Sequence, residues 1–141
     1  PNPRTAHWPG MDDRIQEPSR RNEVEREAIS LLRRTMADGV GVVRTAEGLT
    51  AALAVIDALE ERCKRRSIRN MMTAGKAVAA AALLRRESRG GHSRADYPKE
   101  DPAFARRTYL TAKDIAAVVR EAADSEIGRR AVEALPAVGD A

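Results

Sequence analysis

One segment near the middle of the chain constrains the fold more than any other part of the sequence. Between Met71 and Leu84 only Thr73 and Lys76 carry polar side chains, and alanine is the commonest residue. A helix that is apolar around most of its circumference has to be covered on more than one side. We therefore expect a helix over about 67–88 at the centre of an antiparallel three-helix bundle. Helical spacing assigns five residues to its core face: Ile68, Met71, Gly75, Val78 and Ala82.

Two further helices are predicted before this segment. Apolar residues at helical spacing indicate one helix over about 22–37, which Gly39 terminates, and another over about 46–65, which Thr45 caps. The connector "GVGVVR", residues 39–44, is predicted to be extended and too brief to found a sheet. Aromatic residues make up 3% of the chain, so the core must consist of small aliphatic side chains, which favours helices. The predicted fold class is all-α.

The chain is predicted to divide into three parts. Residues 1–21 are rich in proline and lack apolar periodicity, which is typical of a linker or a surface arm. The three-helix bundle occupies residues 22–98. Residues 99–141 form a polar, irregular C-terminal extension with a short fourth helix at about 111–124, where Thr111 and Asp114 make a capping-box variant. A frayed tail follows, marked by Pro136 and Gly139.

Charge and cysteine content exclude several classes of protein. The net charge is +4, but 25 basic and 21 acidic residues are interspersed, which favours solvated helix faces; a basic nucleic-acid-binding module remains an alternative. The single cysteine, Cys63, cannot form an internal disulfide and falls on an apolar helix face, so we interpret it as a small buried hydrophobe. The longest apolar run, residues 77–84, is far shorter than the roughly 20 residues needed to span a bilayer. We expect a cytoplasmic protein without a membrane segment.

Sites for cofactors and metals are not predicted in this chain. It carries no glycine-rich phosphate loop of a recognised type, and one cysteine with two histidines cannot build a zinc site.

The densest polar stretch is "ESRGGHSRADYP", residues 87–98. Three interpretations are open. In the first, His92 is a general base oriented by Asp96, with Ser88 or Ser93 as nucleophile. In the second, the turn at residues 90–91 forms an anion site with Arg89 and Arg94. In the third, the stretch is a structural helix end, with a glycine cap and basic side chains that bind carbonyls and carboxylates of a neighbouring surface.

The core face of the third helix continues into this stretch. Past Ala82 it leads to Arg86 and Arg89, so a packing face becomes cationic in the last predicted turn. The helix dipole favours basic residues at a helix C-terminus. This explains why the two residues are basic, but not why they lie on the packing face.

Two longer stretches resemble a known family. They are "LLRRTMADGVGVVRTAEGL", residues 31–49, and "RNMMTAGKAVAAAALLRRESRGGHSRADYP", residues 69–98. Their order is similar to that in the C-terminal helical domain of the L-aspartate oxidases, which are relatives of the succinate dehydrogenase and fumarate reductase flavoprotein subunits. The resemblance extends over roughly residues 23–111. Gly91 and Ser93 depart from it, because the family usually has a larger side chain at the first position and often an aromatic at the second.

This resemblance implies an FAD-dependent enzyme that oxidises L-aspartate to iminoaspartate, on the bacterial route to quinolinate and NAD, with quinolinate synthase as pathway partner. The equivalent domain of a succinate dehydrogenase or fumarate reductase flavoprotein subunit is the alternative. The family's catalytic and flavin-binding residues lie in its flavin-binding and capping domains, and no position here matches them. We therefore expect no catalysis, FAD or metal binding by this chain alone. The expected role is docking on the flavin-binding domain through Arg86, Arg89, His92, Arg94 and Asp96.

Overall fold

The computed structural model describes residues 20–136 of the 141-residue chain. Residues 1–19 of the predicted arm (1–21) and the end of the predicted tail, with Gly139, lie outside the described residues. The last two residues predicted for the arm, Arg20 and Arg21, are instead helical. Residues 20–136 form five α-helices, a short 3-10 helix and two very short strands, which confirms the all-α prediction. In chain order these are α1 (Arg20–Gly39), β1 (Val43–Arg44), α2 (Ala46–Arg62), α3 (Arg66–Leu84), β2 (Ser93–Arg94), η1 (Pro102–Phe104), α4 (Ala112–Asp124) and α5 (Glu126–Glu133).

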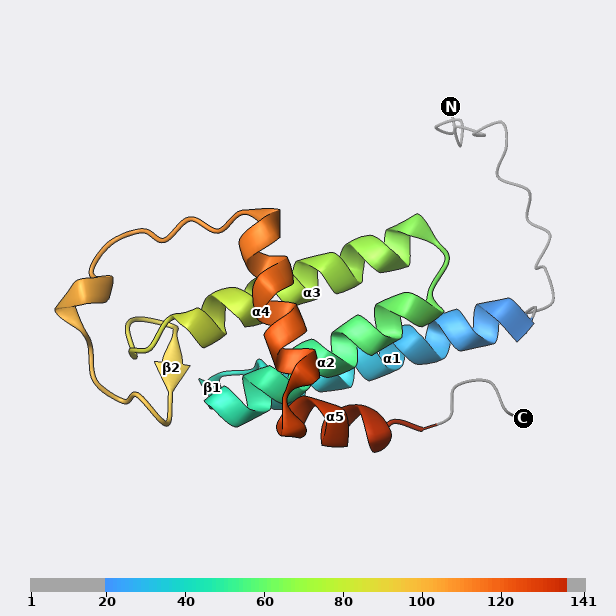
Figure 1. Cartoon of the computed structure of the whole chain (residues 1–141), viewed down its shortest axis with the longest axis horizontal. Helices are drawn as coiled ribbons and strands as arrows, with labels where there is room; N and C mark the ends of the chain where they lie inside the picture. The colour runs from blue at the N-terminus through green and yellow to red at the C-terminus, as the bar shows by residue number, and fades with distance from the viewer. Residues whose placement is uncertain (1–19, 137–141) are drawn as a thin grey trace, which may run out of the picture.

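The central helix of the fold is α2. It contacts all four other α-helices, and Figure 1 shows it between α3 and α5 with α4 crossing in front. Its residues 52–56 are buried without interruption, so other parts of the domain surround the middle of this helix. The prediction that placed the third helix at the centre is therefore wrong.

At two positions of α3 the buried residue is the one that follows the predicted residue in the sequence. Ile68, Gly75 and Ala82 are buried as predicted, but Met71 and Val78 are exposed, and Met72 and Ala79 are buried in their place. Both members of each pair are apolar, so the sequence pattern alone could not distinguish them. At Gly75 an added Cβ would lie 3.4 Å from the Met36 sulfur of α1 and 3.5 Å from the Ile56 side chain of α2, which shows how closely the three helices approach.

The predicted fourth helix is confirmed as α4. The Thr111 hydroxyl accepts a hydrogen bond from the Asp114 amide at 3.2 Å, and the Asp114 carboxylate accepts one from the Thr111 amide at 2.8 Å, which completes the capping box. The frayed tail is wrong over residues 126–133, because the chain forms α5 there and packs on α2. Gly128 allows the close approach of α5, since a Cβ at this position would lie 3.0 Å from the Ala54 Cβ.

The connector after α1 pairs with the segment after α3. Val43 lies opposite Ser93 and Arg44 opposite Arg94 in a parallel pair, although the sequence predicted that the connector would found no sheet. The third helix ends at Leu84, four residues before its predicted end at about residue 88. No helix within residues 20–136 is long and apolar enough to cross a membrane.

Candidate functional site

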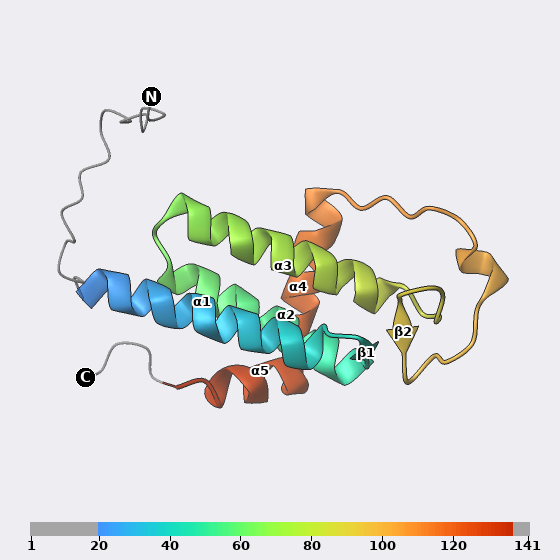
Figure 2. The same cartoon turned by 180° about the vertical axis from the view of Figure 1, so that it is seen from behind.

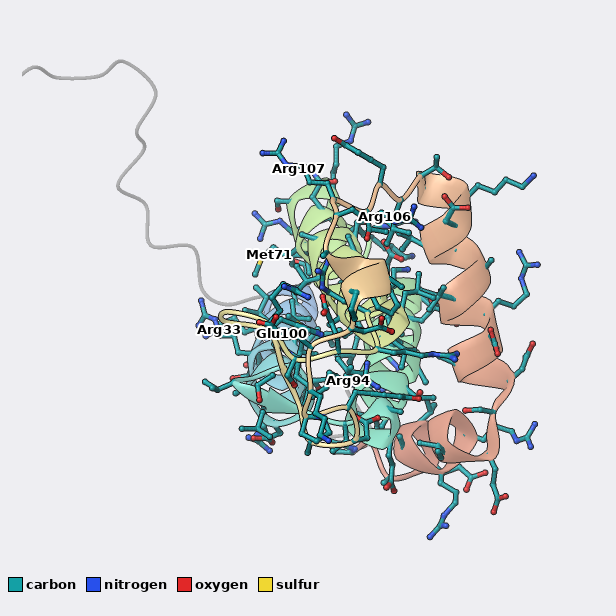
Figure 3. All side chains as sticks on the ribbon, turned by 90° about the vertical axis from the view of Figure 1, so that its left-hand side faces the viewer. Arg33, Met71, Arg94, Glu100, Arg106 and Arg107 are labelled. Atoms are coloured by element: carbon teal, nitrogen blue, oxygen red, sulfur yellow. The ribbon has the colours of Figure 1, made fainter. Side chains whose placement is uncertain are left out.

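The segment after α3 folds back over the C-terminal end of that helix. Figure 1 shows β2 beside the end of α3 and close to β1, and Figure 3 views the same end of the molecule directly, with Arg94 near its middle. Most of the predicted site residues belong to this segment.

Arg94 is almost completely buried, with 1% of its side chain exposed. Its Nη1 donates hydrogen bonds to three carbonyl oxygens at the end of α3, those of Ala82 (2.8 Å), Leu83 (3.0 Å) and Arg85 (3.3 Å). Its Nε and Nη2 donate to the two carboxylate oxygens of Asp96 at 2.8 and 2.7 Å. Arg94 therefore satisfies the carbonyls that a helix C-terminus leaves without partners, and its charge favours that end of the helix dipole.

Asp96 extends this contact to a second helix. Its Oδ2 accepts a hydrogen bond from the backbone amide of Ala46, the first residue of α2, at 3.0 Å. The pKa of Asp96 falls to about 2, chiefly because Arg94 hydrogen-bonds the carboxylate and despite partial burial, with the Ala46 amide adding to the effect. We call this pair the Arg94–Asp96 clasp. It joins the C-terminus of α3 to the N-terminus of α2, and the Tyr97 ring lies 5.1 Å from the Arg94 guanidinium.

A second cluster surrounds Glu87, whose side chain is fully buried. Arg85 and Arg89 both pair with this carboxylate, Arg89 at 3.0 Å, and the backbone amide of Asp101 donates to it at 2.9 Å. The pKa of Glu87 falls to about 2, first because of the hydrogen bonds from Arg89, which outweigh the opposing effect of burial. Arg89 also pairs with Glu100 at 3.0 Å. The Glu87 cluster, meaning Arg85, Glu87 and Arg89, thus fastens the loop at residues 99–104 to the end of α3.

His92 connects the same segment to β1. Its Nδ1 lies 2.9 Å from Nη1 of Arg44, and its Nε2 lies 3.2 Å from the carbonyl oxygen of Arg85. A guanidinium only donates and a carbonyl only accepts, so both contacts are satisfied by a neutral ring protonated on Nε2. Backbone hydrogen bonds between Arg89 and His92 close the turn between them, where Gly90 adopts a φ of +58°.

The proposed catalytic triad is not assembled by these contacts. Both ring nitrogens of His92 bind groups other than Asp96, and Asp96 is held by Arg94 and the Ala46 amide. The Ser88 hydroxyl accepts from the Arg94 amide at 2.8 Å and lies 2.8 Å from the Tyr97 carbonyl, to which it donates. These contacts are structural.

The two arginines of the proposed anion site also bind their own chain. Arg89 faces Glu87 and Glu100, and Arg94 faces Asp96 and the carbonyls of α3. The observed contacts are those of the structural interpretation, with two differences. The carbonyls and carboxylates belong to this segment and to α3, not to a neighbouring surface. The helix also ends without a glycine cap, because Gly90 lies six residues beyond Leu84.

Among the residues predicted to dock on another domain, only Arg86 is both exposed and without an ion pair to the described residues. Arg94 lies inside the domain, so its guanidinium is not available to a neighbour. Glu87 and Arg44 were not among the predicted site residues. The sequence does hold a signal for Glu87, since the acid stands two residues from an arginine on each side.

Metal-ligand clusters and the single cysteine are further candidate reactive groups. Within residues 20–136, no three histidine, cysteine, aspartate or glutamate side chains are grouped so that they could hold a metal ion. Cys63 is buried as predicted, and burial is the main reason why the pKa of its thiol is raised, followed by the nearby charges of Glu25 and Glu60.

Comparison with known proteins finds a flavoprotein family and two L-aspartate oxidases among the relatives of this chain. Residues 61–134 match the family described as fumarate reductase flavoprotein C-term. The chain is 50% identical over 80 residues to an L-aspartate oxidase of Rhodospirillum rubrum, an alignment that covers 57% of this chain and 29% of that protein. It is 42% identical over 84 residues to an L-aspartate oxidase of Caulobacter vibrioides, covering 60% of this chain and 16% of that protein.

A third relative is an uncharacterized FAD-dependent oxidoreductase of Methanocaldococcus jannaschii, 35% identical over 80 residues, covering 48% of this chain and 15% of that protein. No solved structure matches the chain. The chain thus spans less than a third of the length of each of these relatives. Since the family match covers more than half of the chain, including α3, α4 and the whole segment between them, the chain belongs to the fumarate reductase flavoprotein C-terminal family.

Proposed function

We propose that this chain is the C-terminal helical domain of an FAD-dependent L-aspartate oxidase, a cytoplasmic enzyme that converts L-aspartate to iminoaspartate. The observation that carries the proposal is the 50% identity to the Rhodospirillum rubrum L-aspartate oxidase over 80 residues. The oxidation removes two electrons from aspartate, and FAD supplies the acceptor for them when it is bound. Quinolinate synthase, which would use the product, is the proposed pathway partner.

The proposed role of this domain is structural. Arg89 and Arg94 bind carboxylates of their own segment, and His92 binds Arg44 and a carbonyl. These contacts do not form a flavin site, which supports the proposal that FAD is held by other parts of the enzyme. The segment at residues 85–98 would instead present a fixed surface to the flavin-binding domain, with Arg86 in direct contact and with Arg89, His92, Arg94 and Asp96 holding the backbone beneath it.

A second candidate is supported by the description of the matching family. That description names fumarate reductase, so the equivalent domain of a fumarate reductase or succinate dehydrogenase flavoprotein subunit is the alternative. The two candidates differ in substrate, since the first oxidises an amino acid and the second interconverts succinate and fumarate, which have no amino group.

Purification of the full-length protein that contains this chain tests both candidates. Under anaerobic conditions, L-aspartate should bleach the flavin absorbance and succinate should not. Bleaching by succinate alone would support the alternative, and a full-length protein that binds no flavin would contradict both. Salt-dependent retention on heparin, lost steeply as salt is added, would instead support a nucleic-acid-binding module.

A further inference from the structure

The outward face of α3 carries no polar side chain over almost three turns. Four apolar residues follow one another along it at helical spacing and are all exposed, with Met71 40% and Val78 51% accessible: Met71, Ala74, Val78 and Ala81. The two polar residues in this part of the helix face α2 instead. The Thr73 hydroxyl lies 3.3 Å from Glu60, and Lys76 Nζ lies 2.8 Å from Asp57. We call the four apolar residues the α3 stripe.

Such a face is unusual in a chain in which one third of the residues are charged. The exposed side of a surface helix normally carries charged residues, as α4 does with Lys113, Arg120 and Glu121. The α3 stripe has the composition of a core and the exposure of a surface. Apolar side chains gathered on one exposed face make that face a candidate for contact with other protein.

The rest of the described chain leaves the α3 stripe uncovered. Figure 2 shows α1 and α3 towards the viewer and α4 behind α3. Figure 3 places Met71 on the side of the molecule opposite α4 and α5. Helix α4 therefore covers the inner side of α3, and the outer side has no partner within residues 20–136.

We propose that the α3 stripe docks on an apolar strip of the remainder of the same flavoprotein chain. This inference rests on the proposed function. The chain spans 29% and 16% of the lengths of two L-aspartate oxidases, so most of such a protein lies outside the present domain.

The small size of the stripe favours a neighbour within one chain over a second molecule. Stable contacts between separate molecules bury about 800 Å² on each partner, with some twenty residues or more on each side. Four residues along one helix fall far short of this. A covalently attached neighbour is present at high effective concentration, so a small contact is sufficient.

Two cysteine variants of the full-length protein test this docking. Ala81 lies in the α3 stripe and Ala117 on the exposed side of α4, and both are exposed alanines within helices. Ala81→Cys and Ala117→Cys are therefore matched changes. Each variant is treated with a maleimide under native conditions, and labelling of the peptide containing the new cysteine is followed by mass spectrometry.

Docking predicts that Cys labelling in the Ala81→Cys variant is about tenfold or more slower than in the Ala117→Cys variant, because the interface must open before the thiol can react. Equal rates would overturn the proposal. Protection that disappears on dilution would also overturn it, since this would identify a second copy as the partner. Labelling does not depend on the substrate, so a protein that protects position 81 but leaves L-aspartate unoxidised would refute only the proposed function.

Discussion

The Arg94–Asp96 clasp gives the most direct test of how this fold is held together. The substitution Arg94→Met keeps an unbranched apolar stem in the buried site and removes the guanidinium. Three carbonyls at the end of α3 then lose their donor, and Asp96 loses both hydrogen bonds from the guanidinium. The contacts that remain to Asp96 include the hydrogen bond from the Ala46 amide.

The expected cost follows from the burial of the pair. Removing one partner of a buried ion pair costs about 3–5 kcal/mol, because the other charge remains uncompensated. Arg94 is 1% exposed but Asp96 retains 30%, so water partly compensates the carboxylate and the expected loss is near the lower end, about 3 kcal/mol. In urea, with a slope of roughly 1–3 kcal/mol per molar, the unfolding midpoint should fall by about 1–3 M.

Urea unfolding followed by circular dichroism measures this loss, and Arg86→Met is the matched control. Arg86 is an exposed arginine in the same segment without an ion pair to the described residues, so its replacement should change the free energy of unfolding by no more than about 0.5 kcal/mol. If Arg94→Met costs less than about 1 kcal/mol, or no more than Arg86→Met, the clasp does not stabilise the fold as argued.

Two further predictions concern pH and backbone approach. Because the pKa of Asp96 is lowered from 3.8 to about 2 in the fold, its carboxylate contributes its full stabilisation above the unfolded pKa and loses it as the pH falls towards 2. The difference in urea midpoint between wild type and Arg94→Met should therefore shrink between about pH 5 and pH 2, and a constant difference would contradict this. Two of the helical glycines, Gly75 and Gly128, should respond oppositely to alanine. Gly75→Ala, whose Cβ meets only ordinary contacts at 3.4 Å or more, should stabilise by up to about 1 kcal/mol. Gly128→Ala, whose Cβ would lie 2.0 Å from the Ala122 carbonyl oxygen, should destabilise the fold. Thermal unfolding should therefore show a higher midpoint for Gly75→Ala and a lower one for Gly128→Ala, and shifts of the same sign would refute this prediction.

The features that sequence predicted well are local ones. The capping box of Thr111 and Asp114 needs only residues three positions apart, and the burial of Cys63 follows from the pattern of one helix. The end of α3 was predicted four residues too late, because nothing in Arg85–Ser88 itself breaks a helix. The side chain that binds the last carbonyls of this helix, Arg94, comes from ten residues beyond Leu84.

The sequence predicted which stretch holds most of the candidate site but not which residues that stretch binds. The polar stretch at residues 87–98 was correctly recognised as the densest part of the chain. Its partners, however, include Arg44 and the amide of Ala46, which lie some fifty residues earlier and become neighbours only when β1 and β2 pair. The helix α5 was missed because eight residues are too few to establish a periodicity, and its burial depends on α2.

The clasp also has a consequence for how the two helices open. The last turn of α3 and the first turn of α2 share one ion pair, although they are at opposite ends of their helices in chain direction. Helix ends normally fray independently of each other. Here, release of Asp96 would free the Ala46 amide and release of Arg94 would free the carbonyls of α3, so both ends should fray in a single cooperative event. The hairpin of α2 and α3 is therefore expected to open as one unit, because the Arg94–Asp96 pair closes it into a ring.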